Sequence, residues 1–165
     1  QRLDFEAMRD TLLAVAGRLD LTEGGRAVDM TDAAATRRTV YGFVERQNLP
    51  GLFRTFDFAS PDTTSSQRFS TTVPQQALYM MNSPFVVRQA QALAARPDVQ
   101  SQPGDEPRIQ RLHQLAFQRN PDAEDLRLAR AFLAGQATGA EKPALSAWEK
   151  YAQVLLLANE LLFVD

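Results

Sequence analysis

Residues with clear catalytic potential are scarce in this chain. Its 165 residues include a single histidine, His113, and no cysteine. Histidine suits general acid and base catalysis because its unperturbed pKa lies near neutrality. A serine hydrolase would pair it with a serine on a G-x-S-x-G turn, but that motif is absent and the serines gather mainly between residues 60 and 70. We therefore expect His113 to be a structural or surface residue of a helix.

An anion could be bound by charged residues in the first half of the chain. The candidate ligand or interdomain contact residues are Arg37, Arg38, Arg54, Asp57 and Arg68. Guanidinium groups bind carboxylate, phosphate and sulfate through paired hydrogen bonds, so a polysaccharide with sulfate or uronic acid groups would be a suitable ligand. The plainer interpretation is that these residues form ion pairs that hold irregular segments onto the helices.

Metal, cofactor and nucleic-acid sites are not expected. The lack of cysteine excludes thiolate metal ligands, disulfides and covalent attachment of c-type haem. Asp57 and Asp62 are typical of turns, whereas Glu124 and Asp125 suit the first turn of a helix, where the helix dipole favours acidic side chains. The net charge of −2 gives no support to a nucleic-acid partner. We predict no catalytic residue and no cofactor in this chain.

The most apolar stretch predicts a core helix rather than a membrane span. It runs over 14 residues, from 151 to 164, and contains two amides and one carboxylate. Crossing a bilayer takes about 20 mostly apolar residues. The chain opens with Gln1 and shows no basic segment followed by an apolar one, so we expect no signal peptide and a piece of a larger multidomain protein.

A helical hairpin or a kinked helix is predicted from Arg68 to Arg96, and the rest of the chain should be organised around it. Thr72 and Gln75 have the spacing of a capping box, in which each side chain bonds the backbone N–H at the other position. Ser83 followed by Pro84 is a second helix start, because serine can accept a hydrogen bond from a free amide and proline has none to lose.

The remaining elements follow from hydrophobic spacing. A helix is expected over about residues 3–16 and ends at Gly17, an extended segment over 39–45, and one or two helical turns over 51–56. Loops are expected over 20–35 and 59–72, and a break between subdomains near 97–107. Helices should follow around residues 109–116 and after Asp122, with one central final helix packed against the hairpin and with Asn159 as a buried amide on its apolar stripe.

Four blocks of sequence carry a resemblance to a known family. They are RRTVYGFVERQNLPGLFRTFDFASPD, STTVPQQALYMMNSPFVVRQAQALA, RIQRLHQLAFQRNPDAEDL and AWEKYAQVLLLANELLFVD, in this order, and AVAGRLDLTEGG precedes them. Together they resemble the C-terminal domain of unknown function of planctomycete-type, cytochrome-associated exported proteins. The resemblance spans nearly the whole chain.

The resemblance implies a periplasmic or extracellular location and neighbouring domains in the same polypeptide. Haem, where the family has it, belongs to another domain that carries Cys-x-x-Cys-His, and no catalytic residues carry over. The family's recurring positions match Arg37, Arg38 and residues 70–78 of this chain.

We therefore expect a mainly α, compact, bundle-like domain that covers residues 1–165. Its predicted function is that of a non-catalytic structural or interaction module that packs against neighbouring domains. The alternatives are an anionic polysaccharide-binding or accessory part of a glycan-degrading enzyme, and a docking surface for a c-type cytochrome domain.

Overall fold

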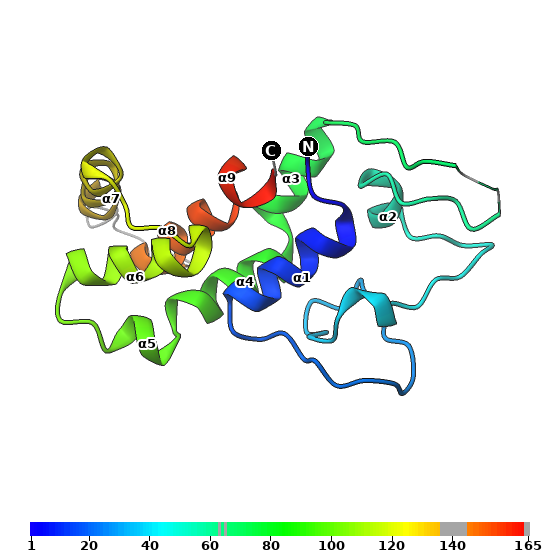
Figure 1. Cartoon of the computed structure of the whole chain (residues 1–165), viewed down its shortest axis with the longest axis horizontal. Coiled ribbons are helices and arrows are strands. Elements are labelled where there is room, and N and C mark those ends of the chain that lie inside the picture. The colour runs from blue at the N-terminus through cyan, green and yellow to red at the C-terminus, as the bar shows by residue number, and fades with distance from the viewer. Residues whose placement is uncertain (63, 65, 136–144, 164–165) are drawn as a thin grey trace.

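The computed structural model describes residues 1–62, 64, 66–135 and 145–163 and confirms a mainly helical fold (Figure 1). In the described residues, β-structure is limited to three isolated bridges. The irregular segments between the first and third helices gather at one end of the molecule, and the sixth and seventh helices lie at the other (Figure 1). The elements are α1 (Phe5–Val15), η1 (Thr39–Tyr41), α2 (Gly51–Thr55), α3 (Pro74–Asn82), α4 (Pro84–Ala94), α5 (Pro97–Gln100), α6 (Asp105–Phe117), α7 (Ala123–Gly135), α8 (Ala147–Leu156) and α9 (Asn159–Leu162).

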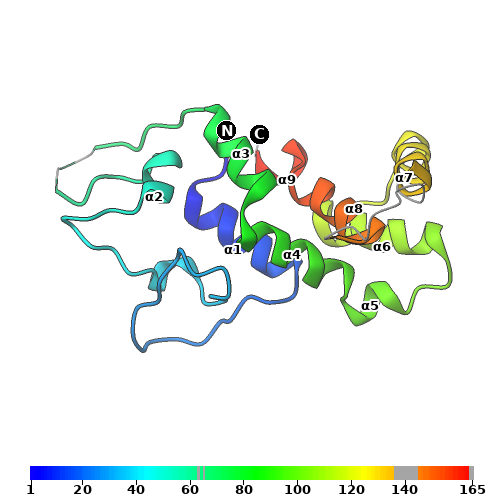
Figure 2. The ribbon, with the colours of Figure 1, turned by 180° about the vertical axis from the view of Figure 1, so that it is seen from behind.

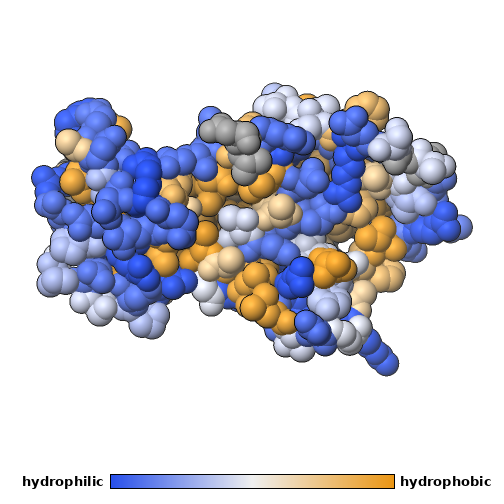
Figure 3. All heavy atoms as spheres, in the orientation of Figure 1, coloured by the Kyte–Doolittle hydropathy of each residue, from blue (hydrophilic) through white to orange (hydrophobic). Residues whose placement is uncertain are grey.

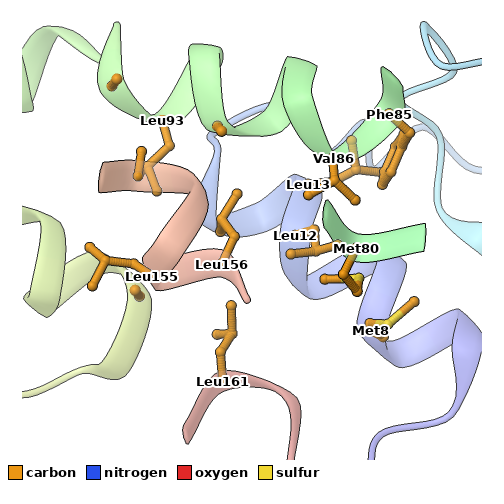
Figure 4. Close-up of a cluster of buried hydrophobic side chains, with 14 of the residues drawn as sticks. Met8, Leu12, Leu13, Met80, Phe85, Val86, Leu93, Leu155, Leu156 and Leu161 are labelled. Carbon is orange, nitrogen blue, oxygen red and sulfur yellow. The ribbon is translucent and has the colours of Figure 1, made fainter. Parts of the chain in front are cut away.

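The core forms where α4 packs along α8 and against α1. Leu156 of α8 lies among side chains from three other helices, including Leu12 of α1, Val86 of α4 and Leu161 of α9 (Figure 4). Leu12, Val86 and Leu156 are completely buried. The expected packing of the final helical segment against the hairpin is therefore confirmed, and α4 and α8 form the centre of the fold.

Of the two helix starts predicted for the hairpin, one is confirmed and the other is wrong by one residue. Ser83 caps α4 as predicted, because its Oγ accepts a hydrogen bond from the N–H of Phe85 at 3.2 Å. The predicted capping box at Thr72 and Gln75 is wrong by one residue. Helix α3 begins at Pro74 after Val73, and Gln76 turns inward to donate to the carbonyls of Thr55 and Thr71, at 2.8 and 3.1 Å. The glutamine that anchors this start therefore makes long-range bonds.

The predicted single final helix is interrupted. Helix α8 ends at Leu156, and α9 begins at Asn159 after a break at Leu157 and Ala158. The break turns the chain so that Leu161 enters the core, whereas Asn159 is exposed. The prediction that Asn159 is a buried amide is wrong, because its place on the apolar stripe holds only for a continuous helix.

The extended segment expected over 39–45 is also corrected. Residues 39–41 form the 3-10 turn η1, and only the next residue, Gly42, makes a bridge, to Val28. A Cβ atom on Gly42 would lie 2.7 Å from Cγ of Met30, so the pairing requires a residue without a side chain. The helical turns predicted over 51–56 are confirmed by α2, which buries Phe53.

Helix α1 holds the irregular segment that follows it. Arg9 is buried and donates to the carbonyls of Ala35 and Arg37, at 2.6 and 2.9 Å. Asp10 accepts from the N–H and the hydroxyl of Thr39, at 2.8 and 2.6 Å. The predicted end of this helix at Gly17 is confirmed by its φ of 70°. These contacts fix residues 35–39 on α1 without any sheet.

The two ends of the described chain lie side by side (Figure 2). The N–H of Leu3 donates to the carbonyl of Leu162 at 2.8 Å, and Arg2 forms a bridge with Phe163. The segment 97–107, where a subdomain break is predicted, contains α5 with a buried Val99, and the break itself stays a prediction. None of the described helices combines the length and hydrophobicity that a membrane crossing requires.

Candidate functional site

Three of the five candidate residues are bound to other parts of the chain. Arg37 lies over the ring of Tyr41, with Cζ 4.1 Å from the ring centroid, and its guanidinium donates to the carbonyls of Thr22, Gly24 and Arg26. It therefore organises the loop that precedes it. These acceptors are backbone carbonyls rather than carboxylates, so the ion-pair interpretation does not describe the hydrogen bonds of this arginine.

Asp57 and Arg68 tie the long loop before α3 to the N-terminal part of the chain. Asp57 forms an ion pair with Arg2 at 2.8 Å and accepts from the N–H and hydroxyl of Thr71. Arg68 forms an ion pair with Glu6 at 2.8 Å. These contacts match the interpretation in which ion pairs hold irregular segments onto the helices.

Arg38 and Arg54 are the candidates whose side chains carry no hydrogen bond or ion pair among the described residues, and both are exposed. Arg38 lines a hollow that is also lined by Glu6 and Asp10. The two carboxylates make this hollow a poor site for an anion. The structure does not gather all five candidates in one site, and the role of these residues in ligand binding stays a prediction.

A polar cluster at the other end of the molecule contains the buried His113 and Tyr151 and the more exposed Arg119, Asp125 and Glu160. Nε2 of His113 lies 2.8 Å from the hydroxyl of Tyr151, and its Nδ1 lies 3.9 Å from Oδ2 of Asp125. Arg119 pairs with Asp125 at 2.7 Å and with Glu160 at 2.6 Å, so the cluster joins α6, α7, α8 and α9. The expectation that His113 is a structural helix residue agrees with this burial in the packed interior.

The electrostatics of this cluster keep its two buried ring groups neutral. Burial lowers the pKa of His113, and the charge of Asp125 only partly opposes that effect. Burial also raises the pKa of Tyr151, which keeps its phenol neutral. An imidazole and a phenol that both remain neutral connect the helices by hydrogen bonding. In the described residues, no group of three potential ligands could hold a metal ion.

The depressed pKa of His113 predicts a loss of stability in mild acid. The unfolded chain binds a proton at His113 near pH 6.5, whereas the folded chain binds it only at lower pH. The free energy of unfolding should therefore fall as pH drops through 6.5 and stop falling below the native pKa. Urea unfolding between pH 7.5 and 5 would measure this slope.

The variant His113→Gln supplies the control for that measurement. The sequence has no other histidine, so the variant should be less stable at neutral pH but should lose most of the slope above pH 5.5. An unchanged slope in the variant would contradict the assignment, because carboxyl groups would then account for it.

Apolar side chains that reach the surface form the second notable feature. Leu78 and Met81 on α3 and Val154 on α8 are 56%, 55% and 49% exposed, and we call these three residues the apolar patch. Gln153 joins the two helices by donating to the carbonyl of Met81 at 2.9 Å. Figure 3 shows hydrophobic side chains at the surface over α8 and α9 near the centre of the molecule. The patch lies on well-packed helices.

Sequence reasoning did not single out the apolar patch. Leu78 and Met81 are three residues apart on α3, the spacing of one helix face. The buried residues of the same helix, Gln76 and Met80, lie on a different face. The sequence of α3 therefore carries hydrophobic residues on two helix faces, and this pattern could have indicated a second contact surface.

Comparisons with known proteins identify a family and no function. The family model described as PSD1, a protein of unknown function (DUF1553), matches residues 1–133. No curated protein and no solved structure matches the sequence. The match covers most of the chain, from α1 through nearly all of α7.

Proposed function

This chain belongs to the family described as PSD1, a protein of unknown function (DUF1553), and from that premise we propose that it is a non-catalytic interaction module. Its partner is a neighbouring domain of the same polypeptide, in an exported protein of the planctomycete type. A c-type cytochrome domain is one such neighbour. The exported location, the planctomycete type and the cytochrome neighbour rest on the resemblance described above. The contact with the neighbour rests on the surface of the chain.

The apolar patch is the observation that carries this proposal. Leu78, Met81 and Val154 each leave about half of a large apolar side chain in water. Burial of apolar surface contributes about 25 cal/mol per Å², so a covering domain would gain free energy at these positions. Contiguous exposed apolar side chains on rigid helices are typical of interaction surfaces.

The contacts of the polar side chains support the proposal of a non-catalytic module. The neutral His113 and Tyr151 bond each other, and Arg37, Asp57 and Arg68 are occupied by contacts within the chain. These contacts stabilise the fold and leave no convergent acid, base and nucleophile among the described residues. The apolar patch then offers the better contact surface.

Hydrogen exchange in the full-length polypeptide and in residues 1–165 alone tests the proposal. We expect amides of α3 and α8 to exchange more slowly in the full-length protein, because the neighbouring domain covers the apolar patch. The double variant Leu78→Gln, Val154→Gln should abolish this difference while leaving the isolated chain folded. The control is Leu128→Gln on α7, since Leu128 is 52% exposed and lies outside the patch.

Equal exchange of α3 and α8 in both proteins would contradict the proposal. Self-association of the isolated chain that the double variant abolishes would assign the apolar patch to a second copy instead. Binding of a sulfated polysaccharide that is lost in Arg38→Ala and Arg54→Ala would favour the polysaccharide alternative, because these two arginines are exposed and their side chains form no hydrogen bond or ion pair with the described residues.

A further inference from the structure

A small apolar pocket lies between α1, α3 and α9, beside the paired ends of the described chain. Its volume is about 200 Å³. The walls come mostly from hydrophobic side chains of segments far apart in the sequence, among them Phe56, Val73, Ala77, Met80, Leu162 and Phe163. Such a pocket suits the hydrocarbon part of a small molecule.

Arg2 is the one charged side chain among the described residues that line this pocket. It is nearly buried, with 9% of its side chain exposed, and its guanidinium lies 5.4 Å from the ring centroid of Phe56. Its Nη2 donates to Asp57, but Nε and Nη1 are buried and find no acceptor among the described residues. A buried donor without an acceptor costs free energy, so an acceptor in the pocket would be favoured.

Two polar neighbours of Arg2, Asp57 and Gln76, are already hydrogen-bonded within the chain. Asp57 also accepts two hydrogen bonds from Thr71, and the amide of Gln76 donates to the carbonyls of Thr55 and Thr71. The guanidinium offers only donors, so the polar end of a ligand must be an acceptor. A charged acceptor forms the stronger bond with a guanidinium.

We infer that this pocket binds a small amphipathic carboxylate of the medium-chain fatty acid class. The carboxylate accepts a hydrogen bond from the free donors of Arg2, and the hydrocarbon chain lies against Ala77 and Met80. This site does not depend on the docking proposal. It shares Met81 with the apolar patch, but Leu78 and Val154 of the patch do not line the pocket, and Arg2 lies outside the patch.

The methionines provide a direct readout of binding. Three of the four, Met8, Met80 and Met81, line the pocket, whereas Met30 packs against Gly42 at another place. In the chain labelled with ¹³C at the methionine methyl groups, sodium octanoate should produce saturable shifts at the three pocket methionines. The Met30 signal should stay in place and serves as an internal control.

Two variants separate the polar end of the site from its apolar walls. Arg2→Lys keeps a cation beside Asp57 but removes the Nε and Nη1 donors, so it should weaken octanoate binding by about tenfold. It should weaken the binding of octan-1-ol much less, because a neutral hydroxyl forms a weaker bond with a guanidinium than a carboxylate does. Ala77→Phe fills the pocket from α3 and should remove binding of both, whereas Ala14→Phe on the exposed face of α1 is the matched control.

Three results would overturn the inference. They are the absence of shifts up to the solubility limit of octanoate, shifts of equal size at Met30, and octanoate binding that Arg2→Lys leaves unchanged. Met81 belongs to both the pocket and the apolar patch, whereas Met8, Met80 and Arg2 lie outside the patch. The shifts at Met8 and Met80 and the effect of Arg2→Lys therefore distinguish failure of the pocket from failure of the docking proposal.

Discussion

Replacing Arg9 with methionine is expected to lower the free energy of unfolding by about 3 to 5 kcal/mol, the cost typical of breaking a buried polar network. Arg9 has 1% of its surface exposed and donates to the carbonyls of Ala35 and Arg37 and to the hydroxyl of Thr39. Methionine fills much of the same space and donates nothing. The loss of stability therefore comes mainly from the acceptor oxygens, which stay buried but no longer receive a hydrogen bond.

The packing of Arg9 adds to this effect. Its guanidinium lies 4.9 Å from the ring centroid of Phe85, at the start of α4. Arg9 therefore connects the irregular segment, α1 and the central hairpin at one point. Removing it should loosen residues 35–39 first, because their contact with α1 depends on Arg9 and Asp10.

Urea unfolding followed by circular dichroism measures the change, with Arg88→Met as the control. Arg88 is exposed on α4, and the same substitution there should change the free energy of unfolding by no more than about 0.5 kcal/mol. Equal effects at the two positions would show that the buried hydrogen bonds of Arg9 contribute nothing specific.

Truncating Leu156 to alanine is expected to cost about 2 to 5 kcal/mol, the range for removing a large apolar side chain from a packed core. Leu156 is completely buried between α8, α4, α1 and α9 (Figure 4). Three other helices surround the side chain, so no single helix can move in to fill the cavity. We expect a value in the upper half of the range.

Leu128→Ala is the matched control for this truncation. Leu128 lies on α7 with 52% of its surface exposed, and alanine favours helix, so its loss should be close to zero. A loss below about 1 kcal/mol for Leu156→Ala would mean that the contact of α8 with α4 is not the centre of the fold.

Local signals in the sequence were sufficient for most helix starts and stops. Ser83 before Pro84, Asp122 before α7 and Gly17 after α1 all act as predicted. Each depends on hydrogen bonds or backbone angles within a few residues, which the neighbouring sequence specifies. The capping box at Thr72 failed because α3 begins one residue later than predicted. Gln76 rather than Gln75 therefore lies at the helix start, where it also bonds the carbonyl of Thr55, 21 residues away.

The sequence by itself therefore determined the helical class of this protein, the hairpin at its centre and the absence of a catalytic motif, since periodicity and capping are local properties. Only the tertiary structure decided that Arg9 is buried, that the last helix breaks before Asn159 and that Arg37 and Arg68 bond separate segments of the chain. It also created the pocket beside Arg2 and the apolar patch. The physical reason is that their walls and partners come from separate helices and loops, and folding brings these together to bury apolar surface and satisfy polar groups.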